Sequence, residues 1–421
     1  MRKAAITGMG VVAPGGVGAK PFWAQITSGR SATRPVSLFD STGFRSRIAG
    51  EVDFDPIASG LTREQVGGLD RMVQFALVGL AEAITDSGIE LDRLDPARVG
   101  VSVGTAVGLT MTLESQYATV SRNGRDWLVD HTLAADNVFD CFVPSSLARE
   151  VAWAAGAEGP ATVVSTGCTS GLDAVGHALD LIRDGTADVV ITGATDAPLS
   201  PITYACFDAL RATSPDNHDP EGACRPFDRT RNGFALGEGA AIFILEDLER
   251  ALRRGAHVYA ELAGFATRCN AYHMTGLRRD GAEMAAAIRA AMEQARIPAD
   301  SFDYINAHGS GTRQNDVHET EAFKRALGSA AYNIPVSSIK SMIGHALGSV
   351  GSIEIAACAL AIEHGVVPPT ANLREPDPEC DLDYVPLVAR EDPVDSVLTV
   401  GSGFGGFQSA AILRRPEEDR R

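Results

Sequence analysis

The 421-residue sequence predicts an α/β protein built from two similar halves. Short runs of apolar and β-branched residues, each ending in a glycine-rich turn, alternate with alanine-rich stretches of helical periodicity. The apolar runs are continuous rather than alternating, which is typical of strands covered on both faces of a sheet. The chain also exceeds the roughly 250–300 residues at which a single core stops growing, so two packed halves are expected.

The expected strands repeat in type between the halves. In the first half they lie at residues 3–8, 98–104, 162–167, 188–194 and 239–246, and in the second at 259–266, 302–309, 334–340, 397–403 and 409–415. Three strands of each half end in loops of small residues, which indicates an internal duplication with its seam near residues 250–260. We therefore expect one half over residues 1–255, a second over 256–415 and a disordered charged tail over 416–421.

The composition excludes several classes of protein. The hydrophobic share of 45% and the charged share of 22% are those of an ordinary globular chain. A net charge of −17 argues against a nucleic-acid partner, since proteins that bind nucleic acids need a basic surface. The seven cysteines are scattered and form no CxxC pair or Cys/His ligand spacing, so neither a disulfide framework nor a metal site is expected.

The sequence favours a soluble, cytoplasmic protein with no membrane contact. The N-terminus runs straight into a strand pattern without the apolar region of a signal peptide. The longest apolar helical stretch, at residues 352–369, contains Glu354 and Glu363 and is expected to be too short and polar to span a bilayer.

Three glycine-containing motifs fit the letters of functional patterns without meeting their requirements. Residues 8–13 (GMGVVA) and 401–406 (GSGFGG) match a dinucleotide-binding fingerprint, but neither precedes the helix that such a site requires. Both are expected to be tight turns. Residues 344–348 (GHALG) have Ala346 where a serine nucleophile would stand, so a serine hydrolase is excluded.

Cys168 is the strongest candidate for a reactive side chain. It follows a strand-like run and Gly167, which permits a sharp turn, and it precedes a helical pattern at residues 172–182. At a helix N-terminus the dipole favours a thiolate, and free backbone N–H groups can hold a developing oxyanion. The alternative is a buried, unreactive thiol, which is the interpretation for the other six cysteines.

The second half supplies possible partners for this thiol. His308 lies just beyond an expected strand, and His345 lies at the next junction between a loop and a helix. Lys340, one of only four lysines, stands among apolar residues nearby. Asp316 and Glu319 share one face of an expected helix. They form either a solvated helix face or an ion pair with Lys340, and spacing alone does not decide between the two.

Four motifs together resemble the β-ketoacyl synthase family of the thiolase superfamily: STGCTSGLDAVG, INAHGSGTRQND, SSIKSMIGHALG and VLTVGSGFGGFQSA. The resemblance covers nearly the whole chain and is strongest to the ketosynthase alpha subunits of bacterial type II aromatic polyketide synthases. It implies a thiolase-like fold, in which two duplicated α/β halves form a five-layered α-β-α-β-α sandwich. It also implies a decarboxylative Claisen condensation with no metal or other intrinsic cofactor, on substrates carried by the 4'-phosphopantetheine of an acyl carrier protein.

The resemblance also implies roles for individual residues. Cys168 would hold the acyl chain, while His308 and His345 would stabilise the enolate that malonyl decarboxylation leaves. Lys340 would fix His345, held in turn by Asp316 or Glu319. Phe404 would contribute an oxyanion N–H group and act as a gate. The residues expected at the pantetheine arm or the acyl tunnel are Ser310, Thr312, Gly403, Gly405 and Met111, the last within the segment 104–117.

The partners that the resemblance implies are an acyl carrier protein, a malonyl-derived substrate and a homologous subunit without the cysteine, the chain length factor, in a heterodimer. A degradative thiolase would need a second cysteine near the C-terminal glycine loop, and residues 401–408 contain none. A chain length factor itself would lack Cys168. The alternative is a β-ketoacyl synthase II-type enzyme of fatty-acid or reduced-polyene biosynthesis.

Overall fold

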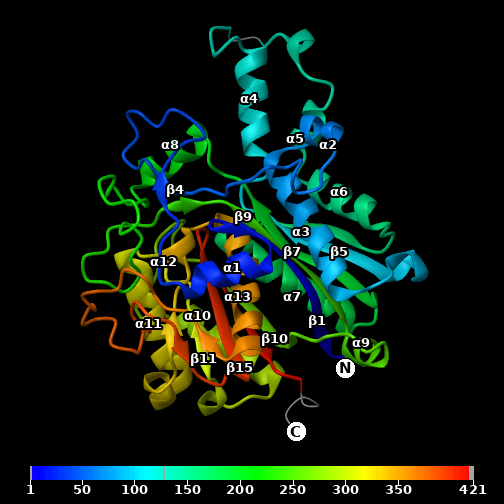
Figure 1. Ribbon diagram of the computed structural model, residues 1–421. Helices are drawn as coiled ribbons and strands as arrows, with labels where there is room; N and C mark the ends of the chain where they lie inside the picture. Colours follow the sequence, from blue (N-terminus) through cyan, green and yellow to red (C-terminus); the bar gives the residue numbers. More distant parts are fainter. Residues whose placement is uncertain (1, 127–128, 417–421) are drawn as a thin grey trace.

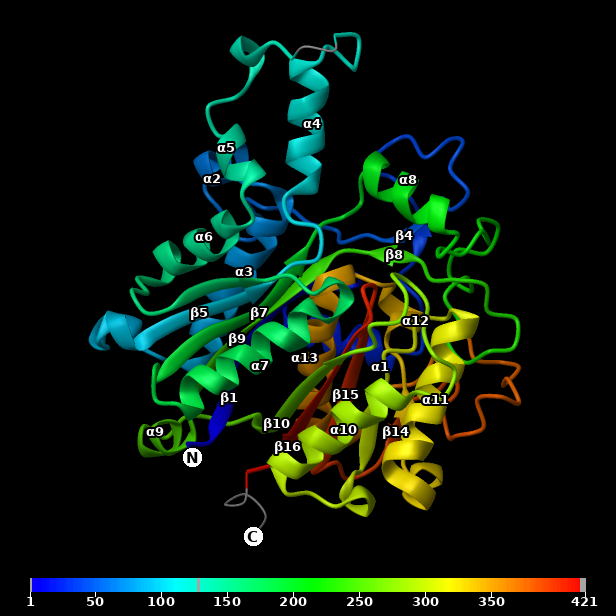
Figure 2. The same ribbon diagram turned by 180° about the vertical axis from the view of Figure 1, so that it is seen from behind.

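The structure, a computed structural model, describes residues 2–126 and 129–416, and it is an α/β protein with a large central sheet (Figures 1 and 2). Strands β1 (Ala4–Ala13) and β10 (Ala260–Cys269) pair antiparallel and join the strands of the two halves into one 11-stranded sheet. The expected charged tail lies outside the described residues apart from Pro416.

The first half contributes strands in the order β6-β5-β7-β9-β1. Along this order the pairings are parallel, parallel, antiparallel and antiparallel. The further bounds are β5 (Val99–Gly104), β6 (Ala161–Val164), β7 (Val189–Asp196) and β9 (Gly239–Asp247). All five strands overlap the expected runs.

The second half repeats this arrangement strand for strand. Its order is β12-β11-β15-β16-β10, and the pairings are again parallel, parallel, antiparallel and antiparallel. The further bounds are β11 (Tyr304–Asn306), β12 (Val336–Ser337), β15 (Ser396–Gly403) and β16 (Phe407–Arg414). The predicted duplication of the α/β topology is therefore confirmed.

Helices form three layers around the strands of the two halves, which gives the predicted five-layered sandwich (Figure 2). One pair packs on the outer face of the first half, one pair on the outer face of the second, and one pair lies in the middle and shares its core with both. In that order the pairs are α3 (Arg71–Ser87) with α6 (Ser145–Ala155), α10 (Ala282–Ala295) with α11 (Arg313–Leu327), and α7 (Ser170–Arg183) with α13 (Val350–His364).

The remaining elements are short and lie at the ends and edges of the sandwich. The helices are α1 (Ala19–Thr27), α2 (Arg63–Gly68), α4 (Thr110–Val120), α5 (Val138–Phe142), α8 (Pro201–Leu210), α9 (Leu248–Arg253) and α12 (Lys340–Ile343). The strands are β2 (Gly16–Val17), β3 (Arg34–Pro35), β4 (Ile48–Gly50), β8 (Leu236–Gly237), β13 (Val366–Val367) and β14 (Arg390–Glu391). Helix α4 stands out from the body of the molecule (Figure 1).

Helix α13 is apolar on every side because it lies in the middle layer. By length and composition alone the stretch Leu347–His364 could cross a membrane, contrary to the expectation that its glutamates make it too polar. However, 89% of this stretch is buried inside the protein, so it is a core helix.

One of the two expected tight turns is wrong. Residues 8–13 belong to the long strand β1, and the glycines there have a packing reason. A side chain at Gly8 or Gly10 would clash with a backbone carbonyl of α3, so glycine lets the helix approach the strand closely. The other turn is confirmed, because residues 404–406 connect β15 to β16.

Candidate active site

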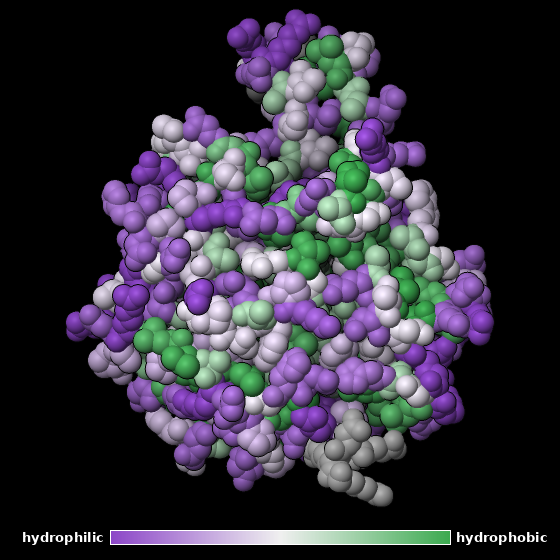
Figure 3. Space-filling model, viewed as in Figure 1, coloured by the Kyte–Doolittle hydropathy of each residue, from purple (hydrophilic) through white to green (hydrophobic). Residues whose placement is uncertain are grey.

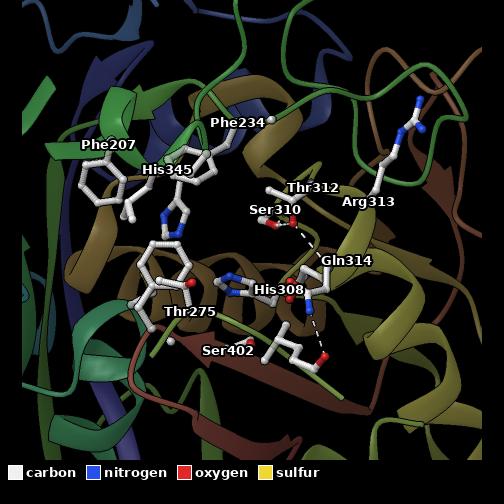
Figure 4. Close-up of a pocket in the computed structure, with 18 of the residues that line it drawn as sticks. Phe207, Phe234, Thr275, His308, Ser310, Thr312, Arg313, Gln314, His345 and Ser402 are labelled. Carbon is white, nitrogen blue, oxygen red and sulfur yellow. Dashed lines mark hydrogen bonds between the residues drawn. The ribbon is translucent and has the colours of Figure 1, made fainter. Parts of the chain in front are cut away.

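A cavity of about 460 Å³ opens at the ends of strands from both halves, and Cys168, His308 and His345 all line it. Figure 4 labels the two histidines in its wall. Cys168 follows β6, and His345 lies beyond β12, the equivalent strand of the second half, while His308 follows the neighbouring strand β11. The strands therefore bring together three side chains that are far apart in the sequence.

Cys168 lies in a single 3-10 turn, Gly167–Thr169, directly before α7. Gly167 has a φ of 64°, a conformation that favours glycine. Cys168 keeps partial exposure to solvent at the cavity, but the protein packed around its thiol raises the pKa to about 11, although the charge of Lys340 and hydrogen bonds from the backbone N–H groups of Phe404 and Cys168 lower it. The expected depressed pKa is therefore wrong: the position at the turn does supply N–H donors, but the loss of solvent outweighs them.

His345 is a neutral ring with a fixed tautomer. Its Nδ1 accepts a hydrogen bond from the backbone N–H of Leu347 at 3.1 Å, so the ring proton lies on Nε2. The ring packs edge-on against Phe234 with centroids 5.0 Å apart. Burial, with the charge of Lys340 as the second cause, lowers the pKa of His345 well below its usual value. His345 can thus donate one N–H at the cavity.

His308 faces His345 across the cavity, with ring centroids 5.3 Å apart and ring planes at 80° (Figure 4). The backbone N–H groups of His308 and Gly309 donate to the carboxylate of Glu319 at 2.5 and 2.8 Å, which fixes this turn. Burial lowers the pKa of His308 well below its usual value, and Lys340 and His345 add to the effect. Both histidines are therefore neutral at pH 7.

Lys340 does not pair with either of the acids expected for it. Its ammonium forms an ion pair with Glu354 of α13, and neither side chain has any exposure to solvent. Asp316 instead pairs with Arg231 at 3.1 Å, and Glu319 accepts the backbone N–H groups described above. The reason lies in the layers, because α12 packs in the middle core with α13, whereas Asp316 and Glu319 belong to α11 in an outer layer.

The carboxylates near the site are strongly affected by burial. Burial raises the pKa of Glu354 to about 7 against the opposing effect of Lys340. It also raises the pKa of Glu319 to about 8, although hydrogen bonds from the backbone N–H groups of Gly309 and His308 oppose this. The pKa of Asp316 is raised for the same reason, with Arg231 acting in the opposite direction.

The residues expected at the pantetheine arm or tunnel divide into two groups. Ser310, Thr312 and Gly403 line the cavity, and the hydroxyls of Ser310 and Thr312 lie 3.1 Å apart. Gly405 lies beside it in the turn after β15, with a φ of 94°. Met111 is elsewhere: it stands at the start of α4 and packs against the outer core of the first half.

Several cavity residues are not found by reasoning from the sequence. Phe207, Phe234 and the loop segment 275–277 complete the wall, and no periodicity marks them. Glu354 does carry a usable signal, because it is an acidic residue in an apolar helix, just as Lys340 is a lysine among apolar residues.

The other cysteines divide into two classes. Cys141, Cys224, Cys358 and Cys380 are buried as expected, whereas Cys206 and Cys269 are exposed, contrary to the expectation. Within residues 2–126 and 129–416 no group of three His, Cys, Asp or Glu side chains is arranged to hold a metal ion.

Comparison with known proteins agrees with this geometry. The family model for the beta-ketoacyl synthase N-terminal domain matches residues 1–251, and that for the C-terminal domain matches residues 259–374. The tetracenomycin polyketide synthase ketoacyl synthase alpha subunit of Streptomyces glaucescens is 67% identical over 100% of this chain and 98% of its own length. The 3-oxoacyl-[acyl-carrier-protein] synthase 2 of Synechocystis is 40% identical over 98% of both.

Two solved structures have the same fold. One is a type II polyketide ketosynthase in complex with its acyl-carrier protein and bound to the hexaketide, with a TM-score of 0.93, 39% identity and coverage of 99% of this chain and 100% of that one. The other is the ishigamide ketosynthase/chain length factor, with a TM-score of 0.90, 34% identity and coverage of 99% of both chains.

The chain therefore belongs to the β-ketoacyl synthase family. It is a condensing enzyme that forms carbon–carbon bonds by acyl transfer, of the ketosynthase alpha class found in type II polyketide synthases. The lower identity to the fatty-acid synthase relative argues against the alternative interpretation.

Proposed function

We propose that this enzyme extends a poly-β-ketone chain held on Cys168, using malonyl groups from an acyl carrier protein, as a heterodimer with a chain length factor. The observation that carries the proposal is the convergence of Cys168, His308 and His345 on one cavity, with two backbone N–H groups directed at the sulfur. No metal or redox cofactor enters the proposed reaction. We place the enzyme in the cytoplasm and the boundary between its halves at residue 255, between α9 and β10.

In the first step Cys168 attacks the thioester carbonyl of the acyl carrier. A bond forms between the Cys168 sulfur and the acyl carbon, and the bond to the pantetheine sulfur breaks. The thiol proton ends on the departing pantetheine thiol, since a pKa of about 11 leaves Cys168 protonated beforehand. The N–H groups of Cys168 and Phe404 stabilise the oxyanion of the tetrahedral intermediate.

In the second step a malonyl carrier enters and loses CO₂. The electron pair of the broken carbon–carbon bond forms an enolate, whose oxygen accepts N–H bonds from neutral His308 and His345. The enolate carbon then attacks the acyl-Cys168 carbonyl, and the Cys168 sulfur leaves and regains a proton. The charge of Lys340 acts on Cys168, His308 and His345, and the ion-pair partner of Lys340 is Glu354 rather than Asp316 or Glu319.

We assign the mouth of the cavity to the carrier and its pantetheine arm. Ser310 and Thr312 offer hydroxyls to the amides of the arm, while Phe404 and its flanking Gly403 and Gly405 form the gate. Outside them, the exposed Arg211 and Arg313 line the mouth (Figure 4 labels Arg313). In the part of the chain that the structure describes, neither guanidinium has a salt bridge within 4 Å, although Arg313 interacts electrostatically with Asp377. We assign both to the phosphodiester of the arm.

We assign the projecting helices of the first half to the chain length factor. Phe139 and Phe142 of α5 are 67% and 68% exposed, and Tyr117 of α4 is 59% exposed. Hydrophobic residues lie among hydrophilic ones on the projection and at its base (Figure 3). Strand β6 ends the sheet nearby and has β5 as its one partner in the described sheet, with Ala161 and Thr162 exposed. Exposed aromatic side chains and a free sheet edge are each typical of an interface with another chain.

The proposal is tested by separating the two half-reactions with a carrier protein and the partner subunit. Cys168→Ala is expected to abolish condensation, because no acyl thioester can form. Cys168→Gln is expected to block condensation too but to keep malonyl decarboxylation, since its amide oxygen can occupy the oxyanion position. In His308→Ala, by contrast, Cys168 should still be acylated, while malonyl decarboxylation should be about 10²–10³-fold slower. Condensation by Cys168→Ala would refute the proposal.

A further inference from the structure

Asp196 is a buried carboxylate for which the proposed reaction has no use. It is the last residue of β7 and is 0% exposed. Its oxygens accept hydrogen bonds from the Thr105 hydroxyl at 2.7 Å, from the backbone N–H groups of Ala106 and Val107 at 2.9 and 3.3 Å, and from the N–H of Gly348. Among the described residues none of these donors is charged. A buried anion held by neutral donors alone calls for an explanation.

The duplication identifies the position of Gly348. The 3-10 turns Gly167–Thr169 and Leu347–Ser349 are equivalent, since they precede the two middle helices α7 and α13. Each turn begins with a left-handed residue, with a φ of 64° at Gly167 and 48° at Leu347. Cys168 is the second residue of the first turn and Gly348 the second of the other. The N–H of Gly348 is therefore the counterpart of the N–H that Cys168 directs at its own sulfur.

The strands show the same correspondence. β7 and β15 occupy equivalent places and have eight residues each, so Asp196 corresponds to Gly403, the residue before Phe404. At the turn that contains Cys168, the N–H groups of Cys168 and Phe404 face a cavity that substrate can enter. At the equivalent turn that contains Gly348, the Asp196 carboxylate occupies the corresponding position: a Cβ on Gly348 would lie only 2.6 Å from Asp196 Oδ2.

This contact lies one peptide from the group that fixes His345. The N–H of Leu347 donates to His345 Nδ1, and the next N–H along the chain, that of Gly348, donates to Asp196. A left-handed conformation at a residue with a branched side chain such as Leu347 is unfavourable and persists only where its surroundings hold it. The Asp196 carboxylate is one of the groups that hold it.

We propose that Asp196 is a positioning residue, whose carboxylate fills a second, duplicated oxyanion hole and so fixes the turn that orients His345 for malonyl decarboxylation. The inference rests on the proposed function and adds to it a part for a residue that touches no substrate. A parallel exists on the other histidine, where the buried Glu319 accepts two successive N–H groups at His308.

The charge of Asp196 also reaches the nucleophile, which provides a second readout. Asp196 raises the pKa of the Cys168 thiol, against the lowering effects of Lys340 and of the N–H groups of Phe404 and Cys168. Removal of this negative charge should therefore move the thiol pKa down. A change that merely loosened the fold would not produce this shift.

The experiment compares Asp196→Asn and Thr105→Val with the wild type, in the complex with partner subunit and malonyl carrier. Asp196→Asn should slow decarboxylation about 10- to 100-fold, because one of the amide's hydrogen-bonding atoms can only donate and faces N–H donors. Acylation of Cys168, measured by protein mass, should change much less, and the pH profile for alkylation of Cys168 should move to lower pH.

Thr105→Val keeps the carboxylate and should slow decarboxylation less than Asp196→Asn, without a shift in the pH profile for alkylation. Glu246→Gln, which changes a buried carboxylate far from the cavity, is the control for stability alone.

Equal losses of decarboxylation and acylation with an unshifted alkylation profile would overturn the inference, as would wild-type decarboxylation in Asp196→Asn. If Asp196→Asn fails to fold, unchanged decarboxylation in Thr105→Val would overturn it. Absence of malonyl decarboxylation in the wild-type complex would instead refute the proposed function, so the two failures are distinguishable.

Discussion

Lys340 and Glu354 form an ion pair in which neither side chain has any exposure to solvent. The second carboxylate oxygen of Glu354 has no hydrogen-bond partner within the described residues, so Lys340 is the group that balances its charge. Such a pair is a weak source of stability but is costly to break, because the remaining charge stays buried.

Glu354→Gln should therefore destabilise the enzyme by about 3–5 kcal/mol, since it leaves the Lys340 ammonium uncompensated. The double variant Lys340→Met/Glu354→Gln removes both charges and should lose less than the single variant. Urea unfolding of the two variants and the wild type provides the comparison. A double variant that is less stable than Glu354→Gln would contradict this account.

In the same double variant, the dependence of malonyl decarboxylation on pH should change. Both histidines have pKa values well below the usual range, and Lys340 contributes to this after burial. Each ring is thus neutral above its lowered pKa and becomes charged as the pH falls through it. Without the Lys340 charge the histidine pKa values rise, so decarboxylation should fail at a higher pH than in the wild type. Rates measured between pH 5 and 8 would reveal the shift, and identical profiles would exclude an electrostatic role for Lys340.

The sequence predicts the layers and the core of the site but not its electrostatics. The duplicated topology follows from strand runs that end in small-residue loops, and the same ends place Cys168, His308 and His345 in one cavity. The partner of Lys340 does not follow, because it depends on how α12 packs against α13. The high pKa of Cys168 depends on burial, which no local pattern contains.

The segment after β5 shows a second limit. Small and apolar residues after a strand end are compatible with a tunnel wall, which is the expectation for residues 104–117. They are equally compatible with the start of a projecting helix, and Met111 begins α4, away from the cavity. Only tertiary packing distinguishes the two.

The pKa of Cys168 reverses one expectation about thiol reactivity. With a pKa of about 11, about one thiol in 10⁴ is ionised at pH 7, and alkylation should rise about tenfold per pH unit up to pH 10. Iodoacetamide should therefore label the exposed Cys206 and Cys269 before Cys168. Peptide mapping by mass after timed labelling measures the order, and first labelling of Cys168 at pH 7 would restore the expectation of a depressed pKa.

The interface with the chain length factor predicts a specific loss of assembly. Phe139→Glu/Phe142→Glu places two charges on the exposed face of α5 and should reduce co-purification of the partner subunit at least about tenfold, since charges at a buried apolar interface are strongly disfavoured. Val388→Glu, at a residue that is 73% exposed in the second half, is the matched control and should leave assembly unchanged. Equal co-purification of the two variants would move the interface elsewhere.

Arg211 and Arg313 at the mouth of the cavity are expected to recognise the carrier rather than the acyl group. Arg211→Glu and Arg313→Glu should raise the KM for acyl carrier protein about tenfold or more, and they should weaken its dependence on salt, because a charged group at the rim of a binding site governs association. An N-acetylcysteamine thioester has the thioester but no phosphate and no protein, so the kcat/KM of each variant for it should remain within about twofold of the wild-type value.

A phosphopantetheine thioester distinguishes contact with the phosphate from contact with the carrier protein. A lower kcat/KM for this substrate in the variants places the arginines on the phosphodiester, whereas an unchanged value places them on the acidic surface of the carrier. Arg289→Glu reverses an exposed charge on the outer helix α10 and should alter none of these values. Equal losses with the carrier and with the N-acetylcysteamine thioester would show that the arginines act on the cavity itself rather than on the carrier.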